Sequence, residues 1–131
     1  MIGLDTNVLV RYVAQDDPKQ SALASELIES LTITSPGFIT MVSVVELVWV
    51  LQSCYESAKS EIITVLETLL RTREFSVENP EIIWQALRVY SQANADFADC
   101  LIERSANAAG CEYIVTFDSK AAKPAGMRRL T

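Results

Sequence analysis

Residues 1–10 read MIGLDTNVLV, an apolar strand over residues 1–4, then Asp5, then the turn into a first helix from Thr6 to Val13. A carboxylate between a buried strand and a helix can serve as a helix cap, a metal ligand or a catalytic acid. The role of Asp5 therefore depends on whether other segments bring acidic side chains to the same end of the sheet.

The rest of the chain alternates short apolar strands with helices. We expect strands over residues 38–40, 74–77, 113–117 and 127–130, and helices over 18–31, 42–53, 57–71, 80–93 and 97–109. Such alternation indicates a parallel sheet covered on both faces. We predict an α/β fold, a three-layer α/β/α sandwich with a central, mainly parallel sheet of about five strands, in a single domain over residues 1–131.

Two of these helices have distinct apolar patterns. In residues 18–31, Leu23, Leu27, Ile28 and Leu31 recur at helical spacing and are expected to face the core. Residues 42–53 are apolar nearly all round, which predicts a buried helix.

The composition excludes several kinds of chemistry. Among 131 residues, of which 50% are hydrophobic, there is no histidine. Ser-His-Asp and Cys-His catalysis, histidine general bases and the common zinc sites are therefore excluded. Any reaction must use carboxylates, hydroxyls, lysines or hard metal ions.

The expected location follows from segments that the sequence lacks. No apolar run is long enough to cross a bilayer, and no basic segment precedes an uninterrupted apolar stretch at the amino terminus. Cys54, Cys100 and Cys111 form no CxxC pair, which favours buried thiols in a reducing compartment. We expect a cytoplasmic protein that does not enter a membrane.

Acidic residues occur where the strands are expected to end. Asp5 follows the first strand, Asp118 ends YIVTFD, and Asp96 and Asp99 open the helix in NADFADCLIERSA. Glu46 is the one charged residue in TMVSVVELVWVL. In open α/β sheets the binding crevice lies beyond the carboxyl ends of the strands. Four segments can thus bring an acid to one edge of the sheet.

Each acid also has a structural interpretation. Asp5 and Asp118 could cap the turns that follow their strands, with about equal weight to a functional role, and Asp96 fits an N-cap better than a ligand. Glu46 is harder to explain in this way, because burial among apolar neighbours such as Val45 is costly for a carboxylate. It requires a cation, a partner or a proton.

Gathering these acids in one place requires a compensating charge. Each close pair of carboxylates costs about 4 kcal/mol at an effective dielectric constant near 20. Several such pairs would consume much of a domain's net stability, which is roughly 5–15 kcal/mol. A divalent ion with oxygen ligands, Mg²⁺ or Mn²⁺, reverses the sign of that interaction. The pattern therefore indicates a metal pocket.

Four motifs in this order, MIGLDTNVLVRYV, TMVSVVELVWVL, DFADCLIERSA and VTFD, resemble PIN-domain nucleases. The resemblance covers essentially the whole chain and is nearest to the VapC-type toxins of type II toxin–antitoxin pairs. It implies metal-dependent cleavage of RNA that leaves a 5′-phosphate and a 3′-hydroxyl. It also implies a homodimer and a cognate antitoxin protein as partners.

The resemblance assigns roles to individual residues, here given together. The acidic catalytic and metal site would consist of Asp5, Glu46, Asp99 and Asp118, with Asp96 as an accompanying acid, and Thr6, Asn7 and Thr116 would support these acids by hydrogen bonding.

The charge distribution offers candidates for contacts to RNA. The net charge is −6, but the basic residues Lys120, Lys123, Arg128 and Arg129 lie near the carboxyl terminus, where no acidic residue follows Asp118. These four side chains could hold the RNA backbone, with Arg11 as a further candidate. A solvated, ordinary tail explains the same charges equally well.

Two alternatives remain open. LDTNV is similar to the DxDx(T/V) loop of haloacid-dehalogenase-like phosphatases, but Asn7 occupies the position of the general acid. A catalytically inactive, PIN-like scaffold that binds a protein would keep the same fold. Retention of all four acids favours the nuclease over both.

Overall fold

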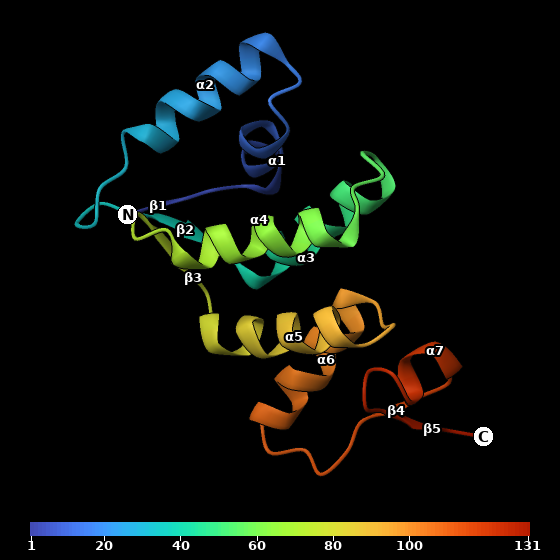
Figure 1. Ribbon diagram of the computed structural model, residues 1–131. Coiled ribbons are helices and arrows are strands. Elements are labelled where there is room, and N and C mark those ends of the chain that lie inside the picture. Colours follow the sequence, from blue (N-terminus) through green and yellow to red (C-terminus); the bar gives the residue numbers. More distant parts are fainter. The chain divides into compact units, whose positions relative to one another are not determined.

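The computed structural model describes residues 1–131, and the chain divides into two compact units. Unit 1 spans Met1–Glu78 and holds three strands and four helices, whereas unit 2 spans Asn79–Thr131 and holds two strands and three helices (Figure 1). All five expected strands are present, but they form two sheets, one of three strands and one of two, and not one central sheet of about five. A single domain over residues 1–131 stays a prediction.

Unit 1 is built on a parallel sheet in the order β1-β2-β3, which confirms the predicted strand direction. The strands are short: β1 is Ile2–Gly3, β2 is Gly37–Ile39 and β3 is Phe75–Val77. β2 is the central strand, because Gly37 pairs with Ile2 on one side and with Phe75 on the other. Asp5 and Thr40 consequently follow neighbouring parallel strands, at the same edge of the sheet.

The helices of unit 1 begin at residues that satisfy their free backbone N–H groups. Asp5 caps α1 (Thr6–Ala14), and Asp17 caps α2 (Pro18–Glu29), in which proline takes the first turn. Thr40 caps α3 (Met41–Ser53) by accepting a hydrogen bond from the backbone N–H of Ser43. α4 (Lys59–Arg71) follows, and α1 packs against both α2 and α3 (Figure 1).

Leu4, which lies between β1 and Asp5, packs closely against the central strand β2. A Cβ atom added at Gly37 would lie 2.7 Å from Leu4 Cδ1 and 2.9 Å from Leu31 Cδ1. Leu4 is buried, at 4% exposure, so its side chain has little freedom to move away. A larger residue at position 37 would therefore require these leucine side chains to move.

Two expectations about unit 1 were wrong. Leu23 is 59% exposed and Leu27 38% exposed, because α2 buries the narrower stripe of Ser21, Ala24 and Ile28. α3 is not buried all round, since Val42 and Trp49 are more than half exposed. Its buried side consists of Ser43, Val44, Leu47, Val48 and Leu51.

Unit 2 is a helix pair followed by a small two-stranded sheet. α5 (Pro80–Gln92) packs along α6 (Phe97–Ala108), and the rings of Tyr90 and Phe97 meet edge to face with centroids 5.6 Å apart. β4 (Val115–Thr116) pairs in parallel with β5 (Arg128–Arg129). A short helix that the sequence did not predict, α7 (Ser119–Ala122), connects them and buries Ala121 beside Ala125 and Met127.

The cysteines match their predicted state only in part. All three are free thiols, but Cys100 alone is buried, whereas Cys54 and Cys111 are exposed. The expectation of three buried thiols was therefore wrong for two of them. None of the helices combines the length and hydrophobicity that a membrane span needs.

Candidate metal centre

Asp5 holds the first turn of α1 with one of its two oxygens. Its Oδ1 accepts a hydrogen bond of 2.8 Å from the backbone N–H of Thr6. The residue is the N-cap of the helix, so the capping interpretation is confirmed. Oδ2 accepts no hydrogen bond from the chain. The cap therefore leaves half of the carboxylate available to a ligand.

Glu46 reaches the same place from α3. Its Oε1 accepts a hydrogen bond of 2.6 Å from the Thr6 hydroxyl. Thr6 thus serves two acids, since its backbone N–H binds Asp5 and its side chain binds Glu46. Glu46 is exposed rather than buried, because α3 turns this face to solvent. The partner that Glu46 was predicted to need is a neutral hydroxyl.

An open hollow of about 350 Å³ lies over this pair of acids. Its wall consists of Asp5, Thr6, Asn7, Val10, Arg11, Glu46 and Val50, all from α1, α3 and the residue before α1. No hydrogen bond joins Asn7 to Asp5, so the support predicted for Asp5 comes from Thr6.

In unit 2, Asp99 experiences the charge of two further acids. Its pKa is raised above the usual value of 3.8, first by partial burial and then by repulsion from the carboxylates of Asp96 and Asp118. Asp96 occupies the N-cap position of α6, but its side chain makes no capping hydrogen bond. The sequence predicted that Asp96 is an N-cap. Its backbone position confirms this, but its side chain does not make the hydrogen bond of a cap.

Asp118 is held in the same way as Asp5. Its Oδ1 accepts a hydrogen bond of 2.8 Å from the backbone N–H of Lys120, which caps α7. Its own backbone N–H donates to the Thr116 hydroxyl at 3.0 Å. Thr116 therefore orients Asp118 through the main chain.

The two units bring together different sets of acids. Unit 1 places Asp5 beside Glu46, and unit 2 places Asp99 within electrostatic reach of Asp96 and Asp118. No group of three acidic or thiol side chains is close enough to enclose an ion. A site that joins Asp5 and Glu46 to Asp99 and Asp118 spans both units, and it stays a prediction.

The donor atoms nevertheless suit a hard divalent ion. Every candidate ligand is a carboxylate oxygen, the type that Mg²⁺ and Mn²⁺ prefer. Partial burial and the neighbouring charges of Asp96 and Asp118 raise the pKa of Asp99, so the ionised form of this carboxyl is disfavoured in unit 2. A cation at this position would relieve that cost.

Comparison with known proteins shows the family to which the chain belongs. The family model for the PIN domain matches residues 2–127. The chain belongs to the PIN-domain family. The match confirms the predicted fold class, an α/β fold with parallel strands. The chain is also 29% identical to the VapC ribonuclease of Aquifex aeolicus (strain VF5) over 114 residues, which cover 87% of this chain and 84% of that protein.

The basic residues predicted to contact RNA lie on the surface of the second unit of this PIN domain. Lys120, Lys123, Arg128 and Arg129 are all exposed. The guanidinium of Arg128 stacks 4.0 Å above the ring centroid of Tyr113, so this arginine is partly ordered by a cation–π contact. Their role in binding RNA stays a prediction.

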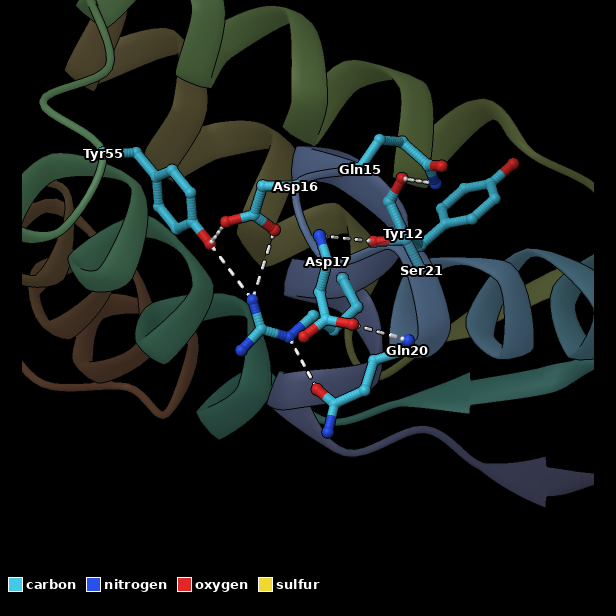
Figure 2. A network of polar contacts seen from close by, with 8 residues as sticks. Tyr12, Gln15, Asp16, Asp17, Gln20, Ser21 and Tyr55 are labelled. Carbon is cyan, nitrogen blue, oxygen red and sulfur yellow. Dashed lines mark hydrogen bonds and ion pairs between the residues drawn. The ribbon is translucent and has the colours of Figure 1, made fainter.

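Arg11, the remaining basic candidate, contacts Asp16, Gln20 and Tyr55, which are labelled in the polar network of Figure 2. Its Nε donates to Gln20 Oε1 at 2.8 Å, and its Nη1 lies 3.2 Å from Asp16 Oδ1. Nη1 also approaches the Tyr55 hydroxyl at 3.5 Å, and that hydroxyl donates to Asp16 Oδ2 at 2.7 Å. The network joins α1, the start of α2 and the residues after α3.

The network also stabilises the ionised form of Asp16. The hydrogen bond from Tyr55 is the main cause that lowers the pKa of Asp16 below 3.8, and Arg11 contributes to the same effect. The same hydrogen bond raises the pKa of Tyr55 above 10.0. Asp16 is thus ionised at neutral pH, and it contacts the guanidinium of Arg11 beside the hollow.

Sequence reasoning missed Asp16, Gln20 and Tyr55. Asp16 and Gln20 carry a weak signal, because they lie on either side of the Asp17-Pro18 helix start. Tyr55 carries none, since it is 39 residues from Asp16 and meets it only through the packing of α1 on α3.

Proposed function

We propose that this PIN-domain protein is a metal-dependent endoribonuclease of the VapC type, the toxin component of a type II toxin–antitoxin pair. The family match over residues 2–127 and the similarity to a VapC ribonuclease support this function. The observation that carries it is the double contact of Thr6, which holds Asp5 and Glu46 at one hollow.

The proposed catalytic site consists of the four acids Asp5, Glu46, Asp99 and Asp118, with Asp96 as an additional ligand. The free oxygens Asp5 Oδ2 and Glu46 Oε2 are available to bind Mg²⁺ or Mn²⁺ or to accept a proton from the attacking water. When bound, such an ion lowers the pKa of water and offsets the charge that develops on the phosphate.

The supporting residues orient these oxygens before the substrate arrives. Thr6 fixes one oxygen of Glu46 and one of Asp5, which leaves the second oxygen of each directed elsewhere. Thr116 and the backbone of Lys120 hold Asp118 in the same manner. Contacts of this kind fix the orientation of metal ligands and raise their affinity for the ion.

The substrate and the partners belong to the same proposal. RNA is held by the exposed basic residues Lys120, Lys123, Arg128 and Arg129, and the protein acts in the cytoplasm. A cognate antitoxin inhibits it, and two copies form a homodimer. Val42 and Trp49, seven residues apart on α3 and therefore on the same face, are 68% and 62% exposed, and this apolar face supports an interface with another protein. Light scattering at micromolar concentration tests the dimer, and a monomer would contradict it.

The decisive experiment is hydrolysis of total cellular RNA by the full chain, with Mg²⁺, with Mn²⁺ and with a chelator. We expect cleavage only with an added ion, and loss of cleavage in Asp5→Asn and Glu46→Gln. Glu26→Gln, an exposed acid on α2 outside the hollow, is the matched control and should remain active. Undiminished cleavage in chelator would refute the metal mechanism, and a folded chain that cleaves no RNA would favour the scaffold alternative.

A further inference from the structure

The Arg11 side chain lies where two hollows of unit 1 meet. It lines the hollow of about 350 Å³ that holds Asp5 and Glu46, and it also lines one of about 300 Å³ between α1 and α2. Asn7 is the one other residue common to both walls. Arg11 is therefore the cation of unit 1 that borders the acid pair.

The donors of Arg11 are only partly used. A guanidinium carries five N–H groups. Nε binds Gln20, and Nη1 binds Asp16 and approaches Tyr55, whereas Nη2 donates to no atom of the chain. Nε and Nη1 of the planar guanidinium therefore bind other residues of the chain, whereas Nη2 remains free to donate a hydrogen bond to a ligand.

Stability alone does not explain this arrangement. The side chains of Arg11 and Asp16 are 34% and 43% exposed, and ion pairs so accessible to water contribute little to folding. Holding a long arginine side chain in one rotamer also costs conformational entropy. Three side chains from separate segments nevertheless converge on this one guanidinium.

We propose that Arg11, fixed by Asp16, Gln20 and Tyr55, binds a phosphate of the RNA next to the acidic hollow. This inference rests on the proposed ribonuclease function and adds a substrate-binding residue with its support. Arginine forms paired, charge-assisted hydrogen bonds with phosphate oxygens. Because Tyr55 and Asp16 order the side chain in advance, binding loses less entropy at the moment of contact. Asp16 and Tyr55 are therefore positioning residues.

The first test measures RNA binding by the full chain in chelator, where no cleavage occurs. The probe is a pool of fluorescently labelled, random-sequence single-stranded RNA, titrated at several salt concentrations. Affinity for RNA falls as the salt concentration rises. The loss of one phosphate contact reduces the magnitude of the slope of log affinity against log salt concentration by about 0.7 for single strands. We expect this decrease for Arg11→Gln and no decrease for Arg11→Lys. Arg73→Gln, which removes an exposed cation elsewhere in unit 1, should keep the slope of the unmodified chain.

The second test separates positioning from charge. Tyr55→Phe removes the hydrogen bond to Asp16 and leaves the charge of Arg11 intact. We expect an unchanged salt slope and a KM about two- to tenfold higher, with kcat retained. Arg11→Gln should raise KM by about tenfold or more, since it loses charge-assisted hydrogen bonds. Circular dichroism melting confirms that each variant is folded.

The outcomes are distinguishable from those of the proposed function. Equal slopes for Arg11→Gln and the unmodified chain, in a protein that cleaves RNA, would overturn the phosphate contact and leave the nuclease intact. An equal reduction of the salt slope in Arg73→Gln would also overturn the phosphate contact, because the reduction would then follow from the loss of any positive charge. An unaltered KM in Tyr55→Phe would refute the positioning role. A chain that cleaves no RNA but shows the specific slope change would retain the contact and lose the enzyme.

Discussion

Asp99 in unit 2 and the pair Asp5 and Glu46 in unit 1 differ in what surrounds their carboxylates. In unit 1, Asp5 and Glu46 share the hydrogen-bond donors of Thr6, so a neutral residue holds both carboxylates together. In unit 2, Asp99 has no such donor, and partial burial together with the charges of Asp96 and Asp118 raises its pKa. The first arrangement is satisfied without an ion, whereas the second carries an electrostatic cost that an ion would remove. The acidic residues of one predicted site can therefore differ in how strongly they require the metal.

The largest expected effect comes from replacing Asp99, the acid whose pKa is raised. Asp99→Asn should lower RNA cleavage by at least about 100-fold, since even outer-shell changes at metal sites cost 10–100-fold. In chelator the same substitution should raise Tm, because it removes the charge that Asp96 and Asp118 repel. Cleavage assays and thermal melts measure the two effects. Glu112→Gln, an exposed acid of unit 2, serves as the control. A lower Tm in chelator would contradict the electrostatic cost.

Removing the Thr6 hydroxyl, which links α1 to Glu46, should have the next largest effect. Thr6→Val deletes the hydroxyl that binds Glu46 and keeps the backbone N–H that binds Asp5. Cleavage or Mn²⁺ affinity should fall by about 10–100-fold, with about 1 kcal/mol lost from the free energy of unfolding.

Two further variants control that experiment. Thr6→Ser restores the hydroxyl and should recover most of the activity. Thr64→Val removes a hydroxyl that bonds only to the Ser60 carbonyl of its own helix, and it should leave cleavage unchanged. Full activity in Thr6→Val would show that Glu46 does not need its partner.

The packing beneath the Asp5 strand gives a third, smaller effect. Gly37→Ala inserts a methyl group 2.7 Å from Leu4 Cδ1, and such overpacking costs about 1–3 kcal/mol. Gly3→Ala, in the neighbouring strand, meets no atom within 4 Å and should change the free energy of unfolding far less. Urea denaturation of both variants measures the difference. Equal stabilities would show that the leucines yield without cost.

The smallest effect is the shift in the pKa of Asp99 itself. In chelator, carboxyl NMR should place its titration midpoint above 3.8. Because the pKa is raised on folding, the ionised carboxylate opposes folding at neutral pH, and this opposition is lost as the pH falls below the raised pKa. Asp96→Asn removes one neighbouring charge and should move the midpoint downward. An unmoved midpoint would exclude Asp96 as a cause of the shift and leave burial and Asp118.

Local patterns in the chain anticipated most elements of the fold. α3 was expected over 42–53 and occupies Met41–Ser53, and α5 was expected over 80–93 and occupies Pro80–Gln92. Pro18 and Pro80 mark helix starts because proline suits the first turn. The sequence did not predict the short helix α7, because four residues are too few to show the apolar periodicity of a helix.

The faces of the helices were less predictable than their ends. Periodicity placed Leu23 in the core, yet the small residues Ser21 and Ala24 are buried instead. The same limitation made Glu46 look buried, since an apolar sequence does not reveal which side of α3 is covered. Burial depends on the neighbouring element, and that information is not local in the sequence.

The sequence by itself determined which atoms can do chemistry: the absence of histidine and the acids after the strands leave carboxylate oxygens as the candidate ligands. It also determined the alternation of strands and helices, because periodicity and capping are local properties. Only the tertiary structure decided that Thr6 reaches Glu46, 40 residues away, and that Tyr55 and Asp16 order Arg11. These contacts depend on how α3 packs against α1, and hydrogen bonds between distant side chains exist only after that packing has formed.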